Sequence, residues 1–331
     1  MTERENALIA IRHGQPEWVP NFYDAYFPMG ASVLNNQGEF RKGGLDMFGV
    51  NWLVTADTGY QAIPDPGQHL IEDITTWPEV IRFPDLDAMD WEGAATRDLA
   101  LLDRKEKLLC LFGMDGNFNR LQSLMGVCEA MIAIMDEPEA VAAFFQAHTD
   151  FKCRTIEKIA RHYQPDIYVN GDDVCSSSGL FISKAMYRDL IKPYEMQLGA
   201  KAKSLGMIVE HHVCGKCEDI LEDILETGAS IWQTAQSMND LVAIKQKFGE
   251  RLLIHGGWNS NDPATVETEE GIRAEVRRCV DAYGQGGNYA LFPIIMGDME
   301  DPVTIQKRGW AADECRRYST MVYSRAKEKA Q

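Results

Sequence analysis

The chain has 331 residues, of which 45% are apolar and 25% are charged, and its formal net charge is −17. This apolar content can build a large core, so neither a disordered chain nor a small disulfide-stapled scaffold is expected. An acidic surface repels phosphate backbones, which argues against nucleic acid as a partner. The substrate is therefore expected to be small, neutral, or bound in a pocket shielded from the surface charge.

The first residues do not form a signal peptide, and no run approaches the roughly 20 apolar residues that cross a bilayer. We therefore expect a cytoplasmic protein that does not enter membranes. In a reducing compartment, the eight cysteines are expected to be free or bound to metal. Five cysteines in apolar or helical context are expected to be structural: Cys110, Cys128, Cys153, Cys279 and Cys315.

Along the chain, short apolar runs alternate with segments of helical periodicity, the pattern of parallel βα units. This predicts one closed (βα)8 barrel over residues 1–331. The eight predicted strands are Val19–Phe22, Asn51–Thr55, Lys107–Phe112, Asp166–Val169, Met207–His211, Ser230–Gln233, Arg251–Ile254 and Asn288–Phe292.

Helices are predicted between these strands, several with clear start or stop residues. Asp240 stands where a helix N-cap is wanted, and Gly206 and Gly249 stand where helices end. The predicted helices are Pro138–Arg161, Ser183–Ser204, Cys217–Glu226, Met238–Phe248 and Thr265–Tyr283.

The segment 27–103 is less regular, and its proline-rich turns predict an elaborated cap. Its aromatic side chains either wall off a substrate or form a small core of the insert itself. These residues are Trp52, Tyr60, His69, Trp77 and Trp91.

The fifth predicted strand ends in His212-Val213-Cys214-Gly215. Alternate side chains of a strand point the same way, so His212 and Cys214 offer a nitrogen and a sulfur on one face. Zinc favours such ligands, and a catalytic zinc keeps one position open. The alternative is a strand end with an incidental buried cysteine.

Polar residues follow several other predicted strands, and in a parallel barrel these positions converge on one rim. They are Asp172, Asp173, Gln233, His255, Asn259 and Asp298. Each alone has a structural alternative: an aspartate can cap a helix, and a lone histidine can be a hydrogen-bonded core residue. Asp172 and Asp173 could orient a ligating imidazole or transfer a proton, and only one of the two is expected to point inward.

The run from Gly171-Asp172-Asp173 through Pro193-Tyr194, His212–Gly215 and Glu226–Ala229 resembles the uroporphyrinogen decarboxylase superfamily. The resemblance covers most of the chain and is clearest from Asp166 to Pro302. It implies a (βα)8 barrel. The decarboxylases of this superfamily carry arginines directly after the first strand, whereas Pro20–Phe27 contains none and includes Asp24. We therefore do not expect porphyrinogen decarboxylation.

The other main branch contains zinc-dependent methyltransferases that work with a corrinoid protein. Their His-x-Cys-Gly motif is matched by His212 and Cys214, but their Cys-Gly after the eighth strand is replaced by Met296-Gly297-Asp298. The resemblance thus implies zinc held by His212, Cys214 and a third ligand. We predict Asp298 as the third ligand, with Glu300, Cys217, Asp172 and Asp173 as alternatives.

A carboxylate in place of a thiolate makes zinc a harder Lewis acid, which favours oxygen over sulfur. The resemblance therefore implies O-demethylation, in which a methoxylated, aromatic donor loses its methyl group to the cobalt of cobalamin. Asp172 and Asp173 are the candidate catalytic residues. The predicted substrate-binding residues are Trp52, Tyr60, Gln233, His255, Asn259 and Met296.

The chain lacks an Asp-x-His-x-x-Gly motif for cobalamin, so a separate corrinoid protein is the expected partner, and a homodimer is also expected from the family. Three alternatives remain open. The protein could methylate a thiol such as coenzyme M from a methylated corrinoid, or decarboxylate a smaller acid without metal. It could also be a binding protein in which His212 and Cys214 are structural.

Overall fold

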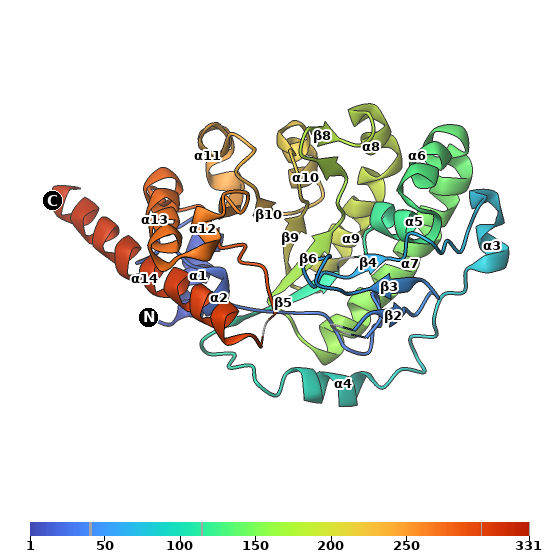
Figure 1. Cartoon of the computed structure of the whole chain (residues 1–331), viewed down its shortest axis with the longest axis horizontal. Coiled ribbons are helices and arrows are strands. Elements are labelled where there is room, and N and C mark those ends of the chain that lie inside the picture. Colours follow the sequence, from blue (N-terminus) through green and yellow to red (C-terminus); the bar gives the residue numbers. More distant parts are fainter. Residues whose placement is uncertain (40–41, 114, 299, 331) are drawn as a thin grey trace.

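The computed structural model describes residues 1–39, 42–113, 115–298 and 300–330 (Figure 1). Its strands are β1 (Tyr26–Met29), β2 (Gly44–Leu45), β3 (Asn51–Leu53), β4 (Ile63–Pro64), β5 (Leu108–Gly113), β6 (Ile167–Gly171), β7 (Cys175–Ser176), β8 (Gly179–Leu180), β9 (Ile208–His212), β10 (Ile231–Ala235), β11 (Leu253–Gly257) and β12 (Tyr289–Phe292).

The α-helices are α1 (Glu3–Ile11), α2 (Phe22–Ala25), α3 (Trp77–Val80), α4 (Trp91–Asp98), α5 (Asn117–Met125), α6 (Val127–Asp136), α7 (Pro138–His162), α8 (Lys184–Leu190), α9 (Lys192–Ser204), α10 (Leu221–Glu226), α11 (Leu241–Phe248), α12 (Ala264–Glu267), α13 (Glu269–Cys279) and α14 (Pro302–Ala330). Among the described residues, no helix is both long enough and apolar enough to pass through a bilayer.

The main sheet has seven strands in the order β1-β5-β6-β9-β10-β11-β12, and every pair is parallel. It curls into a half-barrel that resembles a TIM barrel, with helices along its outer side (Figure 1). Beyond β12, an isolated bridge joins Leu291 to Asn21, and the N–H of Leu291 donates to the carbonyl of Pro20 at 2.8 Å. The far edge of the sheet therefore contacts the segment that leads into β1.

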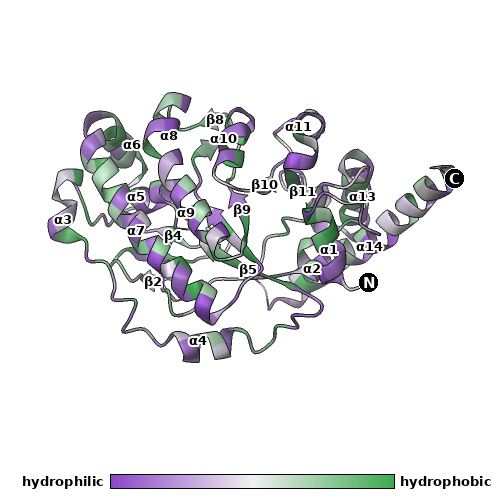
Figure 2. Cartoon of the chain, turned by 180° about the vertical axis from the view of Figure 1, so that it is seen from behind, coloured by the Kyte–Doolittle hydropathy of each residue, from purple (hydrophilic) through white to green (hydrophobic). Residues whose placement is uncertain are grey.

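Inward-facing side chains fill the curl of this sheet. Alternate strand residues form one buried cluster, which the alanines of α1 close at one end. The cluster consists of Ala7, Ala10, Ile11, Ala25, Tyr26, Leu108, Cys110, Ile167, Val169, Ile231, Leu253 and Ala290. Outside the sheet, α7 and α9 show bands of polar and apolar residues, as expected for helices with one buried face (Figure 2).

The prediction of eight barrel strands was wrong at its first two positions. Val19–Phe22 is not a strand, because the Asn21 side chain accepts from Tyr23 N and Asp24 N and so starts α2. The strand predicted at Asn51–Thr55 is β3, which lies between β2 and β4 in a small antiparallel sheet of the insert.

The remaining predicted strands all belong to the main sheet, and α7 matches the predicted helix Pro138–Arg161. The helix predicted at Ser183–Ser204 is broken at Ile191. Pro193 explains the break, because proline lacks an N–H and its ring clashes with the carbonyl four residues earlier. Asp240 caps α11 as predicted, accepting from Ala243 N.

The insert packs on the same core as the barrel helices. Phe48, Val50, Trp52 and Ile71 are buried in one cluster with residues of α5, α6 and α7. In Figure 1, β2–β4 and α3 lie to the right of the main strands and α4 lies below them, whereas α14 extends to the left. The insert therefore lies beside the end of the sheet at which β5 and β6 lead into their loops.

Candidate metal centre

The register of three neighbouring strands brings the candidate residues together. Gly171 of β6 pairs with His212 of β9, and His212 pairs with Gln233 of β10. Because parallel strands end at the same edge, the residues that follow β6 and β9 meet there.

Asp173, His212 and Cys214 form a group that could hold a metal ion. Each offers one ligand atom, and these atoms all lie within 4.8 Å of one another. His212 Nε2 lies 3.7 Å from Cys214 Sγ. All three side chains are partly exposed, so a ligand can reach them. Nitrogen, sulfur and oxygen donors suit zinc, and three protein ligands leave a position open.

Gln233 fixes the orientation of the His212 ring. His212 Nδ1 lies 2.7 Å from Gln233 Oε1. A carbonyl oxygen can only accept, so Nδ1 carries a proton, and Nε2 is the ring nitrogen that faces Cys214. Metal-ligating histidines are commonly held by such a partner. Gln233 is 1% exposed, so its part is to orient His212 and it does not line an open pocket.

Backbone and hydroxyl groups hold the other two candidate ligands. Cys214 N–H donates to Asp173 Oδ1 at 2.7 Å, and Thr234 Oγ1 lies 3.5 Å from Cys214 Sγ. Farther along the loop, Gly215 N–H donates to Gln236 Oε1 at 2.6 Å. Thr234 at the end of β10 and Gln236 just after the strand therefore support the Cys214 loop at two points.

The group stabilises positive charge. Burial disfavours a charged His212, but hydrogen bonding to Cys214 and the charge of Asp173 outweigh it and raise the pKa of His212 to about 9. The same negative groups that attract this proton would attract a cation, and metal binding would displace the proton. The donor set and the charge of the site therefore both fit a divalent metal.

Asp172 faces away from this group. Its two carboxylate oxygens accept from Phe118 N at 3.0 Å and from Asn119 N at 2.8 Å, at the start of α5. Burial raises the pKa of Asp172 to about 7, although these two donors oppose the shift. Of the two aspartates, Asp173 belongs to the metal-compatible group and Asp172 does not.

A cavity of about 530 Å³ lies beside the metal group and reaches Asp173. It opens between the insert and the loops that carry α5 and α6. Its walls include Trp52, Pro64 and His69 from the insert, and Asn119 and Val127 from the barrel side. Its size suits a drug-sized or smaller ligand.

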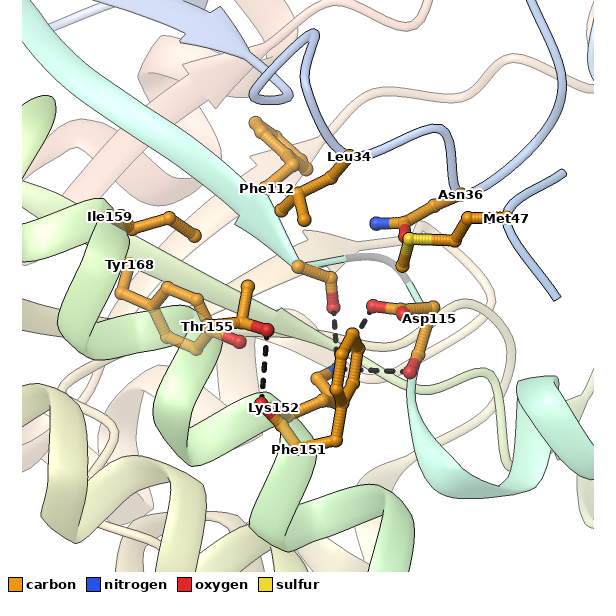
Figure 3. Close-up of a pocket in the computed structure, with 11 residues that line it drawn as sticks. Leu34, Asn36, Met47, Phe112, Asp115, Phe151, Lys152, Thr155, Ile159 and Tyr168 are labelled. Atoms are coloured by element: carbon orange, nitrogen blue, oxygen red, sulfur yellow. Dashed lines mark hydrogen bonds and ion pairs between the residues drawn. The ribbon is translucent and has the colours of Figure 1, made fainter. Parts of the chain in front are cut away.

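A buried ion-pair network borders this cavity. Arg120 Nη1 lies 2.6 Å from Asp46 Oδ2, and Lys152 Nζ lies 3.2 Å from Asp115 Oδ1. Although burial opposes ionisation, Lys152 and other neighbours hold the pKa of Asp115 far below its usual value. Figure 3 shows Lys152 reaching from α7 to the loop after β5, beside a void of only about 20 Å³. Lys152 therefore anchors the loop that carries Asp115.

Most of the predicted substrate residues lie elsewhere. Trp52 lines the cavity, whereas Tyr60 and Met296 are about half exposed and do not line it. His255 is fully buried inside the curled sheet, where its Nδ1 lies 2.8 Å from Glu210 Oε1. Asn259 N–H donates to Glu275 Oε1. Of the other aromatic insert residues, His69 lines the cavity and Trp91 is buried in the core.

The expected third ligand, Asp298, is not a member of the metal-compatible group, and Asp173 is. Asp298 follows β12, and two strands separate β12 from β9. Glu300 is also outside the group. Cys217 is 1% exposed, and its thiol points to backbone carbonyls, including Gly215 O at 3.3 Å.

Sequence reasoning missed the residues that support the site. Thr234, Gln236 and Asn119 each contact the ligand loop or the Asp173 backbone. The polar residues that continue after Gln233 were the available signal for Thr234 and Gln236. Arg120 gave no signal, because its partner Asp46 lies 74 residues away in the insert.

Among the comparisons with known proteins, a match to a family model is the one that identifies a relationship. None of the curated proteins matches this chain. A sugar phosphate isomerase/epimerase from Parabacteroides distasonis is structurally similar over 68% of this chain and 89% of its own, with 10% identity and a TM-score of 0.33. The family model for uroporphyrinogen decarboxylase (URO-D) matches residues 102–293, which include every member of the metal group and most strands of the main sheet. The chain therefore belongs to the uroporphyrinogen decarboxylase family.

Proposed function

We propose that this protein transfers a methyl group from a methoxylated aromatic compound to the cobalt of a separate corrinoid protein. In this proposal Asp173, His212 and Cys214 hold zinc. The observation that carries it is the convergence of their three ligand atoms within 4.8 Å beside a cavity large enough for a substituted ring. The family includes methyltransferases as well as decarboxylases, so the reaction needs its own test.

Zinc bound at this site would supply a Lewis acid that polarises an ether oxygen. The residues of the chain provide the setting for it. Gln233 keeps Nε2 of His212 free to ligate, and Thr234 contacts the Cys214 sulfur. One thiolate among harder donors favours an oxygen substrate over a thiol.

The transfer balances without a further reagent. The methyl–oxygen bond breaks with its electron pair left on the oxygen, which later takes a proton from solvent. Cobalt in the +1 state supplies both electrons of the new cobalt–carbon bond. The partner must therefore present its cobalt to the cavity beside Asp173.

Anaerobic incubation of the zinc-loaded protein with cob(I)alamin and 1,2-dimethoxybenzene tests the proposal. We expect methylcobalamin, seen in the cobalamin spectrum, and an equal amount of 2-methoxyphenol, seen by mass spectrometry. His212→Ala and Cys214→Ser should abolish both products. Methylation of coenzyme M from methylcobalamin without any demethylation would favour the thiol reaction instead, and release of CO2 from a carboxylic acid without zinc would favour a decarboxylase.

A further inference from the structure

We propose that the cavity beside the metal group accepts uncharged methoxylated arenes and excludes rings that carry a carboxylate. This inference rests on the proposed function and names its substrate class. Two observations support it: carboxylates line the cavity, and the neighbouring cations Arg120 and Lys152 are already paired with other carboxylates.

Among the residues that the structure describes, four carboxylates line the cavity: Asp65, Asp115, Glu129 and Asp173. Asp173 belongs to the metal group. Asp65 accepts from the side-chain amide of Asn51 at 3.0 Å and from Gly67 N–H at 2.9 Å. Both donors are neutral, so they hold the Asp65 carboxylate in place without cancelling its charge.

Arg120 lines the same cavity, but other side chains already use its charge. It is 1% exposed and bound to Asp46 at 2.6 Å, and its second partner, Asp115, lies 3.8 Å away. Asp115 is also paired with Lys152, which is itself almost fully buried. The two cations and two carboxylates of this network balance, so the network offers an incoming anion no net attraction.

The rim of the cavity adds negative charge. Glu129 is exposed on α6 and lines the cavity, and the sequence from Leu121 to Phe151 contains no lysine or arginine. Exposed charges act over roughly 8 Å at physiological salt, which is within reach of a ligand entering beside α6. An approaching carboxylate would therefore be repelled before it enters.

A ring bearing a carboxylate would thus lose hydration in the cavity while facing Asp65 and Glu129, whose charges are offset neither by the metal nor by an ion pair with any residue that the structure describes. An uncharged ring avoids this cost and gains apolar contact with Trp52 and the cavity prolines. A quaternary ammonium would suit the charge, but its nitrogen has no lone pair for a Lewis acid to polarise. The uncharged aryl methyl ether is the class that meets both requirements.

Three probes separate charge from size: 1,2-dimethoxybenzene, 3,4-dimethoxybenzoate and methyl 3,4-dimethoxybenzoate. Titration calorimetry with the zinc-loaded protein should give the acid an affinity at least about tenfold weaker than the ester, a difference of about 1.4 kcal/mol. The ester should bind about as well as dimethoxybenzene. The difference in affinity between the acid and the ester should become smaller as salt is added, because salt screens the repulsion.

Charge-removing variants sharpen the test. Asp65→Asn and Glu129→Gln should each reduce the difference in affinity between the acid and the ester. Glu139 is exposed and does not line the cavity, so Glu139→Gln should leave that difference unchanged. Equal binding of acid and ester would overturn the inference, as would equal rejection of both, which would indicate a steric limit. If dimethoxybenzene itself fails to bind, the proposed function falls as well.

Discussion

Asp172 and Asp173 are adjacent in sequence but serve different parts of the molecule. Asp172 binds the N-terminus of α5, and Asp173 joins His212 and Cys214. Their opposite directions follow from the alternation of side chains at the end of an extended segment. The sequence indicated this divergence but could not say which aspartate faces inward, because that depends on where α5 packs.

Asp173→Asn should weaken zinc binding, because an amide oxygen is a poorer ligand than a carboxylate. We expect the affinity to fall by at least about tenfold in a competitive titration with a chelator. Asp298→Asn is the matched control and should bind zinc like the unaltered protein. The opposite ranking of the two variants would place the third ligand at Asp298.

Gln233→Leu should also weaken zinc binding, because His212 would lose the acceptor that fixes its ring. Partners of this kind are worth roughly 10- to 100-fold in metal affinity. Gln233→Glu keeps an acceptor at the same place, so it should retain most of the affinity. An unchanged affinity in Gln233→Leu would show that Gln233 does not orient the ligand.

At the scale of elements, most strands of the main sheet could be predicted from the sequence. The exceptions lie where a helix cap or another pairing partner replaces the expected strand. The apolar runs at β5, β6, β9, β10, β11 and β12 were predicted because they lack competing turn signals. At the first predicted strand, Asn21 caps α2 instead. At the second, Asn51–Leu53 pairs with antiparallel strands of the insert. The ion pair between Asp46 and Arg120 was beyond sequence reasoning, because no local pattern links residues so far apart.

Asp172→Ala should destabilise the protein through α5. It removes the acceptor for two backbone N–H groups, one of them buried, and we expect a loss of roughly 2 kcal/mol in the free energy of unfolding. Asp240→Ala, which removes one exposed cap bond at α11, should cost about 1 kcal/mol. Urea denaturation measures both. Equal losses of unfolding free energy in the two variants would mean that Asp172 stabilises α5 no more than an ordinary helix cap does.

For the whole molecule, buried acids should make stability depend on pH. Burial, assisted by the charge of Asp172, raises the pKa of Glu195 to about 8, while Glu195 accepts a bond from the Tyr187 hydroxyl at 2.7 Å. The folded protein therefore holds this proton more tightly than the unfolded chain, whose pKa is about 4.3. The stabilisation is complete below pH 4 and is lost as pH rises to about 8.

Glu195→Gln should flatten this dependence, because it keeps an acceptor for Tyr187 but cannot ionise. Between pH 5 and pH 8.5, the unaltered protein should lose on the order of 1–3 kcal/mol more stability than the variant. Glu157→Gln, an exposed acid paired with Lys201, should keep the original slope. Identical slopes in all three proteins would show that Glu195 ionises without cost.

X-ray absorption spectroscopy at the zinc edge of the purified, zinc-loaded protein tests the central claim most directly. The account predicts one zinc per chain with a single sulfur neighbour from Cys214 and the remaining neighbours nitrogen or oxygen. It also predicts that Cys214→Ser removes the sulfur signal. A protein that binds no zinc, or a zinc with two or more sulfur neighbours, would contradict it.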